Sequence, residues 1–177
     1  GVDAGAFVTE WRAGYYAIMG RVRRGELPFS RIDDLHRMLL DDLLARRAID
    51  LDEATRVHLN RAWHRLDPWP DAVRGLQRLR ARFMVCTLSN GNLGLLANMA
   101  KRAGLPWDLI LSAEVFGHFK PEPQAYLGLS SVFGLQPAET MLVATHKADL
   151  RGAKRCGLAT AYVERPLEEG PGVTREE

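Results

Sequence analysis

Hydrophobic residues recur at helical spacing through the first 66 residues, and no strand-like alternation interrupts them. The apolar side chains of Phe7–Val22 fall on one broad helical face. A second apolar stripe begins at Ile32, and Ser30 is the predicted N-cap of its helix. Asp52 is predicted to start a third helix, which reaches Trp63. The N-terminal third of the chain is therefore predicted to be a helical module.

The pattern changes after Pro68-Trp69-Pro70, because proline restricts the residue before it to extended conformations. Beyond this point, short apolar runs alternate with helical stretches, which is typical of a parallel sheet. The predicted strands are Phe83–Leu88, Leu109–Leu111, Met141–Ala144 and Ala159–Val163, and three of the helices between them are predicted to end at Gly104, Gly134 and Gly157. We therefore predict an α/β protein, with a helical module in residues 1–67 and a Rossmann-like parallel core in residues 68–177.

The composition narrows the choice of partners and of compartment. Of the 177 residues, 46% are hydrophobic and 26% are charged, an ordinary balance for a soluble domain. A net charge of +2 is too small to indicate nucleic acid, and no apolar stretch approaches the roughly 20 residues that span a bilayer. We expect no signal peptide, because Gly1 opens a polar segment. Cys86 and Cys156 lack metal or redox spacing, which favours buried thiols and a reducing cytoplasm.

Three polar segments follow predicted strands, and the first is Ser89-Asn90-Gly91. Its glycine lets the backbone approach a ligand, and the helix that follows points its N–H groups toward an anion. An ordinary strand-to-helix turn uses the same residue types, so that interpretation stays open. The carboxyl ends of parallel strands meet in one crevice, so we expect Ser89 to share a site with Lys120 and Asp149.

Lys120 lies between Phe119 and Pro121, in a segment that its prolines stiffen. An ammonium held in this way can anchor an anionic nucleophile or neutralise charge as it develops. A solvated loop lysine is the alternative. Tyr126 begins the next predicted helix and can reach the same cleft, although a half-buried core tyrosine fits the sequence as well.

Asp149 follows the predicted strand Met141–Ala144 and opens a helix. It is a candidate to hold the Lys120 ammonium or to position water, and its alternative role is an N-cap. His146 is a candidate general base, and a surface-loop histidine fits equally well. Arg12, beside Trp11 on the first helix, is either a receptor for a carboxylate or leaving anion, or an ordinary surface arginine.

Together these segments resemble the haloacid dehalogenase superfamily, and within it the type II 2-haloacid dehalogenases. The likeness covers nearly the whole chain and depends on the order of its segments: the Pro68-Trp69-Pro70 hinge, Leu88-Ser89-Asn90-Gly91, Phe119-Lys120-Pro121-Glu122-Pro123, Ala144-Thr145-His146-Lys147-Ala148-Asp149-Leu150 with Gly152-Ala153, and Glu164-Arg165-Pro166-Leu167-Glu168. The resemblance implies that the helical module is a cap inserted into the α/β core. It also implies hydrolysis of a small 2-haloacid to the 2-hydroxy acid through an aspartyl ester, with no metal or other cofactor.

The resemblance assigns a role to each candidate residue. Ser89 resembles the residue that receives the substrate carboxylate, and Lys120 the lysine paired with the nucleophile. Asp149 matches the acid that supports this lysine and the hydrolytic water, and Arg12 matches the cap arginine that meets the leaving halide or the carboxylate. Further pocket residues are Asn90, Tyr126 and His146, the last standing where some relatives carry asparagine. The expected partner is a small haloalkanoate, with neither nucleic acid nor membrane, and the apolar cap helix is compatible with a homodimer.

The nucleophile of this family is an aspartate at the end of the first core strand, ahead of the cap. Residues 1–177 begin at the cap, and Asp3 follows no strand. We therefore expect about one further strand and loop ahead of Gly1, because this strand lies in the middle of the sheet in such folds. The 177 residues alone are expected to be inactive.

Two alternative functions are compatible with the same fold. A phosphatase of this superfamily would hold Mg²⁺ through several oxygen ligands. Thr145 stands where such enzymes carry one of their carboxylates, which favours dehalogenation. The second alternative is a catalytically inactive core that carries a helical binding module.

Overall fold

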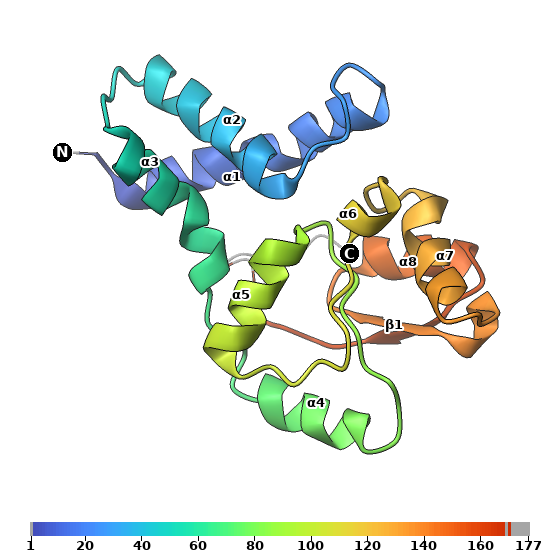
Figure 1. Cartoon of the computed structure of the whole chain (residues 1–177). Helices are drawn as coiled ribbons and strands as arrows, with labels where there is room; N and C mark the ends of the chain where they lie inside the picture. The colour runs from blue at the N-terminus through green and yellow to red at the C-terminus, as the bar shows by residue number, and fades with distance from the viewer. Residues whose placement is uncertain (1, 169, 171–177) are drawn as a thin grey trace. The chain divides into compact units, whose positions relative to one another are not determined.

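The computed structural model describes residues 2–168 and 170 (Figure 1). The internal contacts divide the chain into two compact units, residues 1–119 and 120–177. The domain boundary predicted at residue 67 is a different division, and it stays a prediction. In the described part of the chain, no helix is both long and apolar enough to cross a membrane.

The first unit begins with the helical module that the sequence predicts. Its helices are α1 (Ala4–Arg23), α2 (Ile32–Arg46), α3 (Glu53–Asn60) and the 3-10 helix η1 (Arg61–Arg65). Asp3 caps α1, and Asp52 caps α3 by accepting the Thr55 N–H at 2.7 Å. Each carboxylate satisfies a first-turn N–H that has no partner within its own helix.

The predicted cap of α2 is wrong. Arg31, not Ser30, occupies the N-cap position, and its side chain makes no capping hydrogen bond. The Ser30 hydroxyl instead donates to the Pro28 carbonyl at 3.1 Å, which removes it from the helix end. The first turn of α2 therefore depends on partners from elsewhere in the chain.

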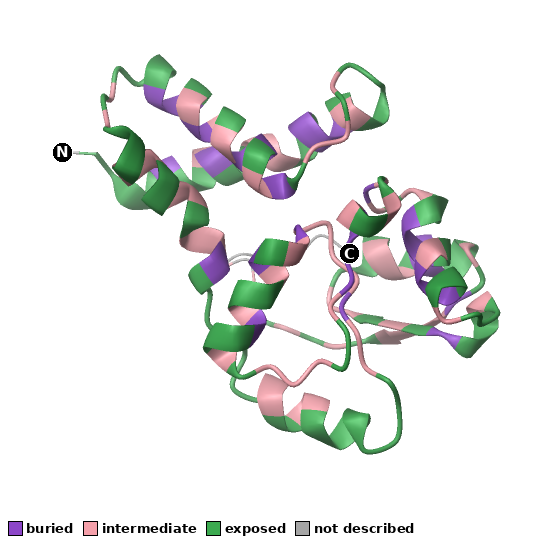
Figure 2. Ribbon diagram, in the orientation of Figure 1, coloured by how far each residue is buried: buried purple, intermediate pink, exposed green. Residues whose placement is uncertain are grey.

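The helices of this module pack through two apolar clusters, which appear as buried stretches along α1 and α2 (Figure 2). The first cluster consists of Ile18, Met19, Ile32, Leu35, Ala113 and Phe119. The second cluster consists of Phe7, Trp11, Leu40, Leu43 and Leu44. Each fully buried leucine contributes roughly 1.5–3 kcal/mol by leaving water, so these clusters are the main source of stability in the module.

The rest of the first unit contains α4 (Ala72–Arg80), α5 (Leu93–Ala103) and the short α6 (Ala113–Phe116). The segments predicted as strands at 83–88 and 109–111 run parallel, but they do not form regular strands. Two isolated bridges join them, Cys86 with Leu109 and Ser89 with Ser112. Between the bridges, the Thr87 hydroxyl accepts the Leu111 N–H at 3.0 Å and donates to the Leu111 carbonyl at 2.7 Å. The Thr87 N–H still donates to the Leu109 carbonyl at 3.3 Å, so a side chain takes the place of only part of the backbone pairing that a regular ladder needs.

The second unit contains the βαβ arrangement that the sequence predicts. Its elements are α7 (Pro123–Val132), the 3-10 helix η2 (Pro137–Glu139), β1 (Met141–Ala144), α8 (Lys147–Arg155) and β2 (Ala159–Tyr162). The two strands are parallel, with Met141 opposite Ala159 and Ala144 opposite Tyr162. Gly157 ends α8 with a positive φ of 87°, a conformation that glycine adopts without steric cost.

His36 on α2 lies inside an aromatic cluster of the first unit. Its ring centroid is 5.0 Å from that of Trp63, 5.6 Å from Tyr15 and 6.2 Å from Trp11. Burial lowers the pKa of His36 to about 4, because a charged imidazolium would lose its water there. The His36 Nδ1 atom is buried without a hydrogen-bond partner.

We therefore expect stability to fall as the pH drops from 6.5 toward 4. The unfolded histidine binds a proton near pH 6.5 and the folded one only near pH 4, so protons favour the unfolded state within this window. The free energy of unfolding should decrease by about 2 kcal/mol between pH 7 and pH 5 from this residue alone. Urea unfolding at both pH values should show a smaller decrease in a His36→Phe variant.

The exposed His58 on α3 offers a matched control for this measurement. A His58→Gln variant should lose as much stability as the unchanged protein over the same pH interval. An equal loss in the His36→Phe variant would contradict the assignment.

Candidate active site

Three of the candidate residues meet at one carboxylate in the second unit. The Lys120 ammonium donates to Oδ2 of Asp149 at 2.5 Å, and the Tyr126 hydroxyl donates to Oδ1 at 2.7 Å. The Lys120 and Asp149 side chains are only 15% and 16% exposed. The charge-assisted bond is therefore largely shielded from water, and it is stronger than a bond between neutral groups.

The local structure explains why these side chains meet. Asp149 lies in the first turn of α8, directly after β1, so its carboxylate lies near the positive end of a helix. Tyr126 lies in the first turn of α7, and Lys120 precedes that helix by three residues. The alternative role of Asp149 as an N-cap is not realised, because His146 occupies that position and makes no side-chain capping bond.

Tyr126 is fully buried and acts as a hydrogen-bond donor to Asp149. Burial raises the pKa of Tyr126, and the hydrogen bond to the Asp149 carboxylate raises it further. The phenol therefore stays protonated at physiological pH. Its hydroxyl fixes the orientation of the carboxylate, which leaves the other oxygen directed at Lys120.

Gly152 on α8 makes room for the tip of Tyr126, a role that the sequence interpretation missed. A Cβ at this position would lie 2.5 Å from the Tyr126 hydroxyl oxygen and 3.0 Å from its ring carbon Cζ. Real Cβ atoms do not approach other atoms so closely, so a side chain here would displace the phenol. The sequence feature that could have drawn attention to this residue is the Gly152-Ala153 pair of the family motif, but the pair by itself does not indicate a contact with Tyr126.

Ser89 and Asn90 lie in the first unit, in the turn before α5. The Ser89 hydroxyl accepts the Gly91 N–H at 3.0 Å, and the Asn90 amide donates to the Met19 sulfur at 3.5 Å. The Ser112 hydroxyl donates to the Gly91 carbonyl at 2.7 Å. The turn therefore has defined internal bonds, and both of its candidate side chains are partly exposed.

The remaining two candidates are Arg12 and His146, and the Asp149 N–H donates to the backbone carbonyl of His146 at 3.1 Å. Arg12 is an exposed residue of α1 in the first unit. His146 precedes α8, and its Nε2 atom lies 2.8 Å from a carboxylate oxygen of Glu168. His146 is thus paired with an acid, which lies beyond the last strand. Within residues 2–168 and 170, no three histidine, cysteine, aspartate or glutamate side chains are grouped so as to hold a metal ion.

The sequence profile of the haloacid dehalogenase-like hydrolases matches residues 3–157. The chain belongs to this family. A curated relative, the (S)-2-haloacid dehalogenase of Xanthobacter autotrophicus, is 30% identical over 93% of the chain and 66% of its own length. The chain spans from about half to about two thirds of the length of the first curated relatives that it matches.

Two crystal structures of haloacid dehalogenases are more similar still. An L-2-haloacid dehalogenase is 44% identical with a TM-score of 0.94, covering 98% of this chain and 77% of its own. A defluorinating L-2-haloacid dehalogenase is 46% identical with a TM-score of 0.95, covering 99% of this chain and 73% of its own. The predicted family and the predicted α/β fold class are therefore confirmed.

Gly152→Ala should disturb the Tyr126–Asp149 contact and lower stability. Alanine improves helix propensity by up to about 1 kcal/mol, but overpacking against a buried phenol costs about 1–3 kcal/mol. We expect the free energy of unfolding in urea to fall by roughly 1 kcal/mol. Gly75→Ala is the matched control, because Gly75 lies in α4 with no atom near its absent Cβ, and it should stabilise.

A second substitution isolates the contact itself. In a Tyr126→Phe background the nearest clashing atom is absent, so Gly152→Ala should cost less than it does beside the tyrosine. Equal costs in the two backgrounds would show that the space at Gly152 is unrelated to the Tyr126 hydroxyl.

Proposed function

We propose that the protein is a hydrolytic dehalogenase that converts a small 2-haloacid to the 2-hydroxy acid through an aspartyl-ester intermediate, without a metal ion. The observation that carries this proposal is the Lys120–Asp149 pair, largely shielded from water and oriented by Tyr126, in a chain so similar to two L-2-haloacid dehalogenases. Such a pair holds the Lys120 ammonium in one place, and a fixed ammonium stabilises an anionic attacking group.

In the first step, a carboxylate oxygen attacks C2 of the haloacid. The C–O ester bond forms, the carbon–halogen bond breaks, and the halide leaves with the bonding electrons. Lys120 holds the attacking carboxylate and Arg12 receives the halide or the substrate carboxylate. Ser89 and Asn90 bind the substrate carboxylate. Asp149 is not the attacking group in this proposal, because both of its oxygens already accept hydrogen bonds. In the family that the chain resembles, the attacking group is an aspartate at the end of a core strand, and we assign the attack to that group.

In the second step, water attacks the carbonyl carbon of the ester. The ester bond breaks, the hydroxy acid leaves, and the carboxylate is restored. Asp149 lies in the first turn of α8 and supports this step by orienting the water. One proton of the water passes to the leaving alkoxide oxygen and the other to solvent. His146, which is paired with Glu168, is assigned to the substrate-binding residues that the resemblance implies.

The cytoplasm is the compartment that we infer from the cysteines. Cys86 and Cys156 are both free thiols, as a reducing compartment would keep them. Both are half-buried, so the expectation of buried thiols holds only in part. The homodimer stays a prediction.

The test of this function is halide release from 2-chloropropionate by the full-length protein, measured together with 2-hydroxypropionate. We expect equal amounts of both products. A single turnover with enzyme in excess in H₂¹⁸O separates the two routes to the hydroxy acid. An ester intermediate leaves the first product unlabelled, whereas direct attack by water on C2 labels it.

Lys120→Ala should lower kcat by about 10²–10³-fold, because it removes the fixed charge at the attacking group. Lys101→Ala is the matched control, since Lys101 is an exposed lysine of α5. It should leave halide release unchanged. Asp149→Asn keeps the size of the side chain and should lower activity in the same direction as Lys120→Ala.

The alternatives give different results in the same assays. Metal-dependent hydrolysis of p-nitrophenyl phosphate without halide release would identify a phosphatase and overturn the proposal. A binding module with an inactive core would release neither halide nor phosphate.

A further inference from the structure

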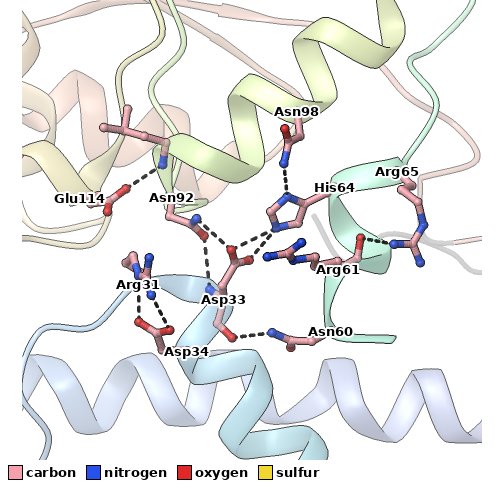
Figure 3. A network of polar contacts seen from close by, with 11 residues as sticks. Arg31, Asp33, Asp34, Asn60, Arg61, His64, Arg65, Asn92, Asn98 and Glu114 are labelled. Atoms are coloured by element: carbon pink, nitrogen blue, oxygen red, sulfur yellow. Dashed lines mark hydrogen bonds and ion pairs between the residues drawn. The ribbon is translucent and has the colours of Figure 1, made fainter. Parts of the chain in front are cut away.

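Asp33, in the first turn of α2, joins three segments of the first unit (Figure 3). Both of its carboxylate oxygens lie 3.0 Å from Nε2 of His64 on η1. The Asn92 amide, at the start of α5, donates to Oδ2 at 3.0 Å. The Asn60 amide donates to the Asp33 carbonyl at 2.9 Å. One acid thus connects α2, η1 and the turn before α5.

Asn92 also supplies the cap that α2 lacks. Its Oδ1 accepts the Asp33 N–H at 3.3 Å, so the two residues exchange a reciprocal pair of hydrogen bonds. This N–H is one of the first-turn donors that a helix leaves unsatisfied, and Arg31 offers it no side chain. A residue 59 positions away therefore caps α2.

The side chain of Asn92 is turned toward Asp33 and makes no capping bond for its own helix, α5. Glu114 fills that place, because its carboxylate accepts the Leu93 N–H at 2.7 Å (Figure 3). The start of α5 is therefore held from two sides, by Asp33 through Asn92 and by Glu114.

His64 closes the network through its second ring nitrogen. The Asn98 amide of α5 donates to Nδ1 at 2.9 Å, so this nitrogen is an acceptor and the proton lies on Nε2, where it is donated to Asp33. His64 is 8% exposed and Asn92 only 3%. Buried polar groups are costly when unpaired, so this network holds one arrangement strongly.

The network acts on the candidate substrate turn, because Asn92 directly follows Gly91. The other side of this turn is held by the Ser112 hydroxyl on the Gly91 carbonyl and by the Ala113 N–H on the Ser89 carbonyl at 2.8 Å. Asn92 is thus the residue through which the helical module can fix the position of the Ser89 hydroxyl.

We propose that Asp33 and His64 are positioning residues, which act through Asn92 to hold the turn that binds the substrate carboxylate. The expected effect on substrate binding rests on the proposed function. The expected effect on the position of the turn rests only on the contacts described above. Removing the network should weaken substrate binding more than it slows the chemical steps.

Asp33→Asn is the central variant, tested in the full-length protein. The new amide at position 33 has one acceptor oxygen in place of two, so its nitrogen faces the donor of either Asn92 or His64 and one acceptor contact of the network is lost. We expect KM for 2-chloropropionate to rise about tenfold, the usual effect of losing one hydrogen bond to a charged group, with a smaller change in kcat. A merely destabilised enzyme would instead lose active fraction, which lowers the apparent kcat and leaves KM unchanged.

The double variant Asp33→Asn/Asn92→Asp exchanges the donor and acceptor between the two positions. All three bonds are again matched, because position 33 still accepts from His64 and position 92 accepts both N–H groups. We expect KM to return to within about threefold of the unchanged enzyme. Failure of this rescue, with both proteins folded, would count against the pairing as the cause.

Two further variants separate the effect of the network from a general loss of stability. Asn98→Ala removes only the hydrogen bond to Nδ1 of His64 and leaves the bonds of Asp33 in place. It should therefore raise KM less than Asp33→Asn does, by about threefold. Leu40→Val is the control for stability, because it removes one buried methylene from α2 away from the network. It should lower the melting temperature without changing KM.

Amide hydrogen exchange tests whether the network holds the turn, and this measurement does not depend on enzyme activity. The Gly91 amide, bonded to Ser89, should exchange at least about tenfold faster in Asp33→Asn, whereas Leu40→Val should leave it unchanged. If the unchanged protein releases no halide, the proposed function fails while faster exchange still establishes the anchor. Unchanged exchange and unchanged KM in Asp33→Asn would overturn the inference altogether.

Discussion

The ion pair between Lys120 and Asp149 sets the chemistry that the second unit can support. The pair is shielded from water, and such a charge is tolerated only when its partner stays in place. Tyr126 secures that partner by taking the other carboxylate oxygen, and the position of Gly152 lets the phenol reach it. The lysine is therefore held in place as a fixed positive charge.

A second acid performs a comparable task in the first unit. Asp33 and Asp149 both lie in the first turn of a helix, where the helix dipole favours a negative charge. Neither carboxylate caps its own helix, so each is available to side chains from other segments. Asp149 orders a cation, whereas Asp33 orders an imidazole and an amide. The same local position thus holds a cation in one unit and forms a structural junction in the other.

The helices were predictable from the sequence, because apolar periodicity and end signals are local. Asp52 and Gly157 stand at the helix ends where their chemistry predicts. The irregular pairing near Thr87 was not predictable, since its hydroxyl bonds a residue 24 positions away. Ser30 has the chemistry of an N-cap, yet a distant side chain satisfies the first turn of α2.

The candidate site shows the same division between local and distant information. Lys120, Tyr126 and Asp149 were candidates because each follows or opens an element, and they share one carboxylate in the structure. Gly152 was missed as a site residue, because its importance lies in the space that it leaves for a side chain 26 positions earlier. His64 was missed as well, since a histidine in a short helical turn carries no signal of its two partners.

The distant cap on α2 has a consequence for how the helical module can be exchanged. The first turn of α2 is complete only when Asn92 is in place, so the module and the start of α5 should form cooperatively. A chimera that grafts residues 1–67 of this chain onto another core keeps all the contacts of Asp33 and His64 only if that core carries the equivalents of Asn92 and Asn98. Moving the helical module into another protein therefore means moving the asparagine at position 92 with it wherever that protein lacks one.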